Sequence, residues 1–161
     1  MLRRSLLVAA LALAPAALAA APVAVAAAGG PPSRASASCS GEIQVTRLAF
    51  TPPAVPPGQT GTANLAARNC TGTSQQTTAV WLGRFVGPSG GIPPGCPAID
   101  PLPQSASFAP HGAFRSSVGY LVPPTCTASK LQITVEFEQD GTVLAQRTAD
   151  LAIIIQPTAA G

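Results

Sequence analysis

The spacing of the four cysteines constrains the fold of this chain more than any other feature. One pair lies almost symmetrically about a proline-rich corner at residues 52–58, and the other lies symmetrically about a Pro-His-Gly turn. Antiparallel neighbours keep a constant sum of residue numbers, so a hairpin folded at either centre brings each pair within bridging distance. Among the three pairings that four cysteines allow, the spacing predicts Cys39–Cys70 and Cys96–Cys126.

A zinc site of four thiolates is the alternative use of these cysteines. Structural zinc sites usually draw ligands from Cys-x-x-Cys pairs, and no two cysteines here lie that close in sequence. An even number of cysteines in an exported chain favours disulfides. We therefore expect no metal ion and no other cofactor.

The N-terminus has the pattern of a secretory signal peptide. Two arginines precede an apolar run, Leu6–Ala20, and small residues at 24–26 form an Ala-x-Ala cleavage site. An uncleaved membrane anchor is the alternative, but prolines and abundant alanine in the apolar run argue against it. We expect residues 1–26 to be removed, which leaves a protein that is secreted or associated with the cell envelope and has no membrane anchor.

The rest of the chain divides into a linker, one domain and a short tail. Residues 27–38 are rich in Ala, Gly, Pro and Ser, a composition that predicts disorder, whereas residues 39–156 suit one domain and residues 157–161 form a tail. Without the two arginines of the signal, seven basic residues face six acidic ones. With so small a net charge and no block of like charge, we expect no binding to nucleic acids.

Apolar and polar residues alternate between the cysteines with the period of two that is typical of β-strands. A slip in this phase between Val45 and Leu48 predicts a bulge or a split in the first strand. Helical periodicity is absent outside the signal. The pattern therefore predicts an all-β antiparallel sandwich of about seven strands, near residues 43–50, 60–69, 76–86, 105–109, 114–122, 131–137 and 143–155.

The last hairpin has a specific predicted register. Gln139-Asp140-Gly141 is typical of a three-residue loop with glycine in its left-handed position, which pairs Phe137 with Val143. A two-residue Asp-Gly turn would instead pair Phe137 with Leu144. We prefer the three-residue loop because it keeps the apolar positions of the last strand on one face.

Several segments resemble secreted immunoglobulin-like or fibronectin type III-like domains of bacteria, especially actinobacteria. The resemblance covers residues 39–156 and is carried by residues 48–58, by Asn69-Cys70-Thr71-Gly72, by Trp81 and by the Asp140-Gly141 turn. It implies an immunoglobulin-like sandwich in which Trp81 is the buried tryptophan of the third strand. The predicted disulfides depart from that family, whose bridge joins the second and sixth strands. Resemblance at the level of the fold specifies no function.

Two groups of residues invite a catalytic interpretation. His111, the only histidine, could act with Asp100 and a serine, but a Pro-His-Gly turn ordinarily holds a solvated side chain. Glu136 and Glu138 share one face of a predicted strand, whereas the paired carboxylates of glycosidases face each other across a cleft. We therefore expect no enzymatic activity and assign no catalytic residues.

The longest irregular segment, residues 87–103, is the candidate binding loop. It is rich in proline and glycine, and the predicted Cys96–Cys126 bridge would stiffen it. Stiff loops lose little entropy on binding. The alternative is that the loop only shields one end of the sandwich. The candidate contact residues are Ile92, Pro97, Ile99, Asp100 and Leu102.

These observations together predict a secreted, non-enzymatic structural or recognition domain whose partner is an extracellular protein or glycan. One alternative is a protein inhibitor or ligand-binding module that uses residues 87–103. Another is an accessory domain for polysaccharides.

Overall fold

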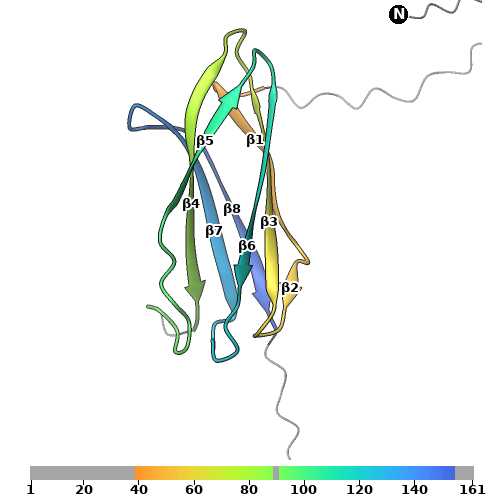
Figure 1. The fold of residues 1–161 in the computed structure, drawn as a ribbon, viewed down its shortest axis with the longest axis vertical. Helices are drawn as coiled ribbons and strands as arrows, with labels where there is room; N and C mark the ends of the chain where they lie inside the picture. Colours follow the sequence, from red (N-terminus) through yellow and green to blue (C-terminus); the bar gives the residue numbers. More distant parts are fainter. Residues whose placement is uncertain (1–38, 89–90, 155–161) are drawn as a thin grey trace, which may run out of the picture. The chain divides into compact units, whose positions relative to one another are not determined.

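The computed structural model describes residues 39–88 and 91–154. They form eight strands in two sheets, together with the loops that connect them (Figure 1). These residues contain no helix that could cross a bilayer. The predicted signal peptide, linker and tail lie outside them. One sheet has the order β1-β3-β6, formed by Ile43–Thr51, Thr60–Asn69 and Ala113–Leu121. The other has the order β2-β8-β7-β4-β5, formed by Ala54–Val55, Thr142–Ile153, Lys130–Gln139, Gln75–Val86 and Leu102–Phe108.

The strand β2 is the element that the sequence pattern did not predict. It lies within the proline-rich corner and pairs with β8 in parallel, with Val55 opposite Ile153. All other strand pairs are antiparallel, as expected. This two-residue strand pairs only with the last two residues of β8, and its buried Val55 brings an apolar side chain into the core.

The predicted irregularity in the first strand is confirmed as a β-bulge. The register between β1 and β3 shifts between Val45 and Arg47. The extra residue, Thr46, donates a hydrogen bond from its hydroxyl to the Ala66 carbonyl at 3.1 Å. Thr46 and Arg47 are both exposed, and Leu48 returns to the core. The bulge thus turns Arg47 onto the outer face of the sheet.

The two sheets face each other across one hydrophobic core. Phe108 of β5, Phe114 of β6 and Phe137 of β7 join the sheets through ring contacts at centroid distances of 5.5–5.9 Å. Gly61 of β3 lies against Leu151 of β8, where a Cβ atom would come within 2.6 Å of the Leu151 Cδ2 atom. This glycine lets the sheets approach, because any larger residue would displace the leucine. Trp81 is 1% exposed, as its phase predicted.

The β7–β8 hairpin differs from the prediction. Gln139 pairs with Thr142, so the turn has only two residues, Asp140 and Gly141, with φ angles of 50° and 77°. Two positive φ angles define a type I′ turn, whose twist matches that of the flanking strands. A register shift beyond the turn then places Phe137 opposite Ala145. The predicted three-residue loop is therefore wrong. The bulge returns the strand to the predicted inward phase only from Ala145 onward and leaves Val143 on the outer face, opposite Glu138.

Both predicted disulfides are confirmed, with Cα–Cα distances of 5.7 Å for Cys39–Cys70 and 4.4 Å for Cys96–Cys126. The hairpin reasoning holds for the first pair, because β1 and β3 are antiparallel neighbours. It is wrong for the second pair. The turn at His111 joins β5 to β6, but β5 pairs with β4 in one sheet and β6 pairs with β3 in the other. The second disulfide therefore links two loops, the one between β4 and β5 and the one between β6 and β7.

Tyr120 offers a direct test of the core between the sheets. Its ring packs on Phe50 at a centroid distance of 6.2 Å, and burial raises the pKa of Tyr120 to about 12. An unfolded tyrosine titrates near pH 10, so the folded state prefers the neutral phenol. We expect stability to be insensitive to this group below about pH 10 and to fall as the pH rises toward 12.

Because Tyr120 is the only tyrosine, the ultraviolet absorbance of the phenolate reports this group alone. The expected midpoint is about 12 in the native protein and about 10 in denaturant. Tyr120→Phe should remove the absorbance change, and it should also remove the part of the stability loss above pH 10 that is due to ionisation of Tyr120. A native midpoint near 10 would contradict the burial of this phenol.

Candidate functional site

The loop between β4 and β5 is fastened to the loop between β6 and β7. The Cys96–Cys126 disulfide joins them covalently. Beside it, the Thr127 amide and hydroxyl both donate hydrogen bonds to the Pro94 carbonyl, at 3.1 and 3.2 Å. The described part of the loop therefore has a fixed base.

Gly95 makes the close approach of these loops possible. Its φ angle is 72°, in the left-handed region that favours glycine. A Cβ atom at this position would collide with the backbone carbonyl of Thr125. No side chain fits there without separating the two loops, so the position next to Cys96 is set by backbone contact as well as by the disulfide.

An apolar hollow of about 320 Å³ lies between this loop and β4. Gly83 and Phe85 of β4 form its floor, and Ile92, Pro97 and Ile99 of the loop contribute to its walls. Ile99 packs over Gly83 and joins the core, whereas Ile92 is 65% exposed. The structure thus brings together three of the five predicted contact residues and gives them different roles.

The other two predicted contact residues do not line the hollow. Leu102 belongs to β5, where it pairs with Trp81, and is 42% exposed. Asp100 is exposed at the end of the loop, two residues before β5 begins. The candidate binding segment therefore ends before Leu102, because the first residues of β5 are fixed by pairing with β4.

The residues considered for catalysis lie apart. His111 is exposed in the turn after β5, whereas Asp100 precedes that strand, so the two lie at opposite ends of β5. Glu136 and Glu138 lie on the outer face of the five-stranded sheet and alternate with buried residues. No group of three or more His, Cys, Asp or Glu side chains that could hold a metal gathers within the described residues.

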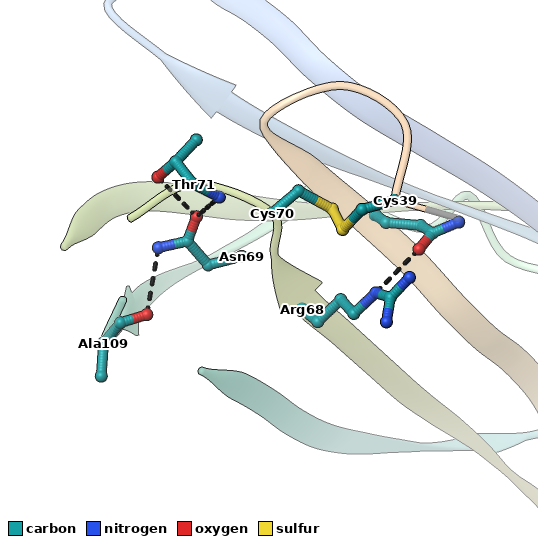
Figure 2. Close-up of a disulfide and its surroundings, with 7 residues drawn as sticks. Cys39, Arg68, Asn69, Cys70, Thr71 and Ala109 are labelled. Carbon is teal, nitrogen blue, oxygen red and sulfur yellow. Dashed lines mark hydrogen bonds between the residues drawn. A yellow bond between two sulfur atoms is a disulfide. The ribbon is translucent and has the colours of Figure 1, made fainter. Parts of the chain in front are cut away.

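A polar cluster next to the first disulfide ties two chain turns together (Figure 2). Asn69 is 1% exposed, and its side-chain amide donates to the carbonyls of Thr73 and Ala109, the latter at 3.0 Å. Its Oδ1 atom accepts hydrogen bonds from the amide and the hydroxyl of Thr71, both at 2.8 Å. Every hydrogen-bonding group of this buried amide is used, so the cluster is structural.

The sequence patterns missed one surface feature, the outer face of the three-stranded sheet. A hollow of about 620 Å³ lies there, flanked by Arg47 and Arg115. The two arginines lie in one row across the sheet, on either side of Ala66. The phase slip in the first strand could have pointed to Arg47, because the bulge moves this residue to the outer face.

No protein-family model and no curated protein matches the chain. Among solved structures, it is similar to part of a Paenibacillus sp. cycloisomaltooligosaccharide glucanotransferase complexed with cycloisomaltoheptaose. The identity is 12% and the TM-score 0.53, over 68% of this chain and 14% of that one. This likeness shows the fold alone.

Two further similar structures have lower TM-scores. One is the Pseudomonas fluorescens alkylpurine DNA glycosylase AlkC bound to DNA containing an abasic site analog, with 13% identity and a TM-score of 0.49 over 70% of this chain and 31% of that one. The other is the sporulation control protein Spo0M from Bacillus subtilis, with 11% identity and a TM-score of 0.46 over 73% and 51%. The chain thus spans between 14% and 51% of the lengths of these three proteins.

Proposed function

We propose that this protein is an exported, non-enzymatic recognition domain that binds an extracellular protein through the loop at residues 91–101. The observation that carries the proposal is the apolar hollow beside Ile92, held on a base that a disulfide and backbone hydrogen bonds fix. A pre-formed hollow that already holds its shape loses little conformational entropy when a partner enters.

A protein partner suits this hollow better than a glycan. The described lining is mostly apolar, and its one charged residue, Arg84, is hydrogen-bonded to Gln132 at 2.6 and 2.9 Å. Sugar hydroxyls would find few partners there. One or two aliphatic or aromatic side chains of a protein would fill the hollow and cover Ile92.

Export and an immunoglobulin-like architecture are part of the same proposal. Two disulfides are typical of proteins that reside in oxidising compartments, and the pattern of residues 1–26 suits a cleaved signal peptide. Two facing sheets, antiparallel apart from the short β2–β8 pair, and a buried tryptophan on β4 support an immunoglobulin-like sandwich. The disulfide positions would set it apart from antibody domains.

The test measures binding of the purified domain to a panel of secreted proteases, other extracellular proteins and insoluble glycans. Ile92→Asp places a charge at the hollow and should weaken binding to a protein partner at least about ten-fold. Val143→Asp is the matched control, because Val143 is 46% exposed and lies in the β7–β8 hairpin, at the opposite end of the sheet (Figure 1).

Two results would overturn the proposal. One is binding that Ile92→Asp and Val143→Asp weaken equally, and the other is a panel in which only glycans bind. Inhibition of a protease that Ile92→Asp abolishes would identify the partner class as an enzyme and the domain as an inhibitor.

A further inference from the structure

We propose that the outer face of the three-stranded sheet binds an acidic glycan, with Arg47 and Arg115 as the residues that hold its carboxylate, sulfate or phosphate groups. This surface is separate from the loop at residues 91–101, which belongs to the other sheet. The inference therefore stands or falls independently of the proposed protein partner.

The bulge in β1 creates the site. With regular alternation after Val45, residue 47 would point into the core. The extra residue at Thr46 shifts the phase, so Arg47 is exposed and lies opposite Ala66 on the outer face. Arg115 lies on the other side of Ala66 in β6. Bulges commonly redirect a side chain at functional sites.

The geometry suits a single anionic group held from both sides. Two strand spacings separate the backbones of Arg47 and Arg115 by about 10 Å, and only the methyl group of Ala66 stands between them in that row. Long side chains on both flanks can therefore reach one ligand above Ala66. A guanidinium presents its donors in a planar fork that matches carboxylate, sulfate and phosphate oxygens.

Neither guanidinium is engaged elsewhere in the described part of the chain. Arg47 and Arg115 make no hydrogen bond or ion pair with any residue of 39–88 or 91–154, and both are exposed. By contrast, Arg84 is bonded to Gln132, and Lys130 is paired with Asp150 at 2.7 Å. The donors of this pair are thus available to a ligand.

Charge is distributed unequally between the two sheets. The strands β1, β3 and β6 carry three arginines and no acidic residue. The strands of the other sheet carry three basic and three acidic residues. Although the whole domain is nearly neutral, every charged side chain on the strands of the three-stranded sheet is positive, so an approaching anion meets no acidic group on them.

The rest of the hollow favours a hydroxyl-rich ligand. Thr51, Thr62, Asn64 and Ser117 line it beside the arginines. The side-chain nitrogen of Asn64 donates to Thr51 Oγ1 at 3.3 Å and to the Thr62 carbonyl at 3.1 Å, which leaves its oxygen as an acceptor. Alternating hydroxyl and amide groups can exchange hydrogen bonds with sugar hydroxyls. None of the lining residues is aromatic, whereas bound nucleic acid bases usually stack on aromatic rings.

The experiment compares four polymers by isothermal titration calorimetry on the disulfide-intact protein. Polygalacturonate and dextran sulfate are acidic glycans, dextran is neutral, and polyglutamate is an acidic peptide. We expect the two acidic glycans to bind, with an affinity that falls as salt rises because the arginines are exposed. Arg47→Gln/Arg115→Gln should weaken this binding at least about ten-fold.

A charge-matched double variant separates the site from net charge. Arg84→Gln/Lys130→Gln removes two positive charges from β4 and β7, whose side chains bond only to Gln132 and Asp150 among the described residues, and should change the affinity less than about three-fold. Equal losses in both double variants would overturn the proposal, as would equal binding of dextran. Failure of both acidic glycans to bind, or tighter binding of polyglutamate, would also overturn it. Near-ultraviolet circular dichroism verifies that each variant is folded.

Discussion

Replacing Asn69 with alanine is expected to lower the free energy of unfolding by about 3–5 kcal/mol. The side chain is fully buried and satisfies the carbonyls of Thr73 and Ala109 and the amide of Thr71. Its removal leaves the Thr71 amide without its partner, which costs about 1–3 kcal/mol. The Ala109 carbonyl still accepts from the Gly112 amide at 2.9 Å, and the Thr73 carbonyl still accepts from the Thr71 hydroxyl at 3.1 Å, so each of these two lost bonds adds about 1 kcal/mol. Since small domains are stable by only about 5–15 kcal/mol, this one change would consume a large part of the total.

Asn64 provides a matched control, because it lies in the same strand, β3, as Asn69. Its bonds are on the outer face of the sheet, where water can replace them, so Asn64→Ala should cost no more than about 1 kcal/mol. Urea unfolding followed by Trp81 fluorescence measures both variants, since Trp81 is the only tryptophan and is buried. A loss below about 1 kcal/mol for Asn69→Ala would show that other groups replace its bonds.

Replacing Phe137 with alanine is the other change with a large expected effect, about 3–5 kcal/mol. Phe137 is completely buried, and its ring contacts Phe108 of the same sheet and Phe114 of the facing sheet. Deleting it opens a cavity where the two sheets meet and removes both edge-to-face contacts. The strands cannot close this gap, because β7 is paired on both sides, with β4 and with β8.

Phe137→Leu and Val143→Ala calibrate this result. Leucine retains most of the volume, so we expect a cost of about 1–2 kcal/mol from the lost ring contacts. Val143 is 46% exposed on β8, and its truncation should change the stability by less than about 0.5 kcal/mol. Similar losses for Phe137→Ala and Val143→Ala would contradict the central place of Phe137 in the core.

The sequence predicts which face of each strand is buried, but it does not predict which strands lie next to one another. The alternation in β3 and β7 identified their buried residues, because burial repeats every second residue whatever strand lies alongside. The alternation contains no information on which strands pair with each other. A Pro-His-Gly turn between β5 and β6 therefore looked like a hairpin, although the chain passes from one sheet to the other there.

The second disulfide illustrates the same limit. Cys96 and Cys126 form the disulfide that their spacing suggested, but neither lies in a strand. They meet because the β4–β5 loop and the β6–β7 loop lie against each other. In the last hairpin, the predicted inward phase holds from Ala145 onward, whereas Val143 lies on the outer face opposite Glu138 and is 46% exposed. The chain uses a tight Asp140-Gly141 turn and a bulge, a combination that residue types alone do not distinguish from a longer loop.

The candidate sites were predictable to different degrees. Proline, glycine and an isolated cysteine pointed to the loop that holds Ile92 and Ile99, since such segments rarely form regular structure. The pairing of Arg47 with Arg115 across Ala66 depends on the neighbours of β3 on both sides, so it required the sheet order.

The burial of Asn69 has a practical consequence for production in eukaryotic cells. Asn69-Cys70-Thr71 matches the acceptor pattern for N-linked glycosylation. In the folded domain, both hydrogens of the acceptor amide are already donated to carbonyl oxygens. An oligosaccharide could be attached only to the unfolded chain, and it would then occupy the space in which β3 meets the turn after β5. A bacterial host that exports the chain to its periplasm avoids this conflict and still allows the cysteines to oxidise.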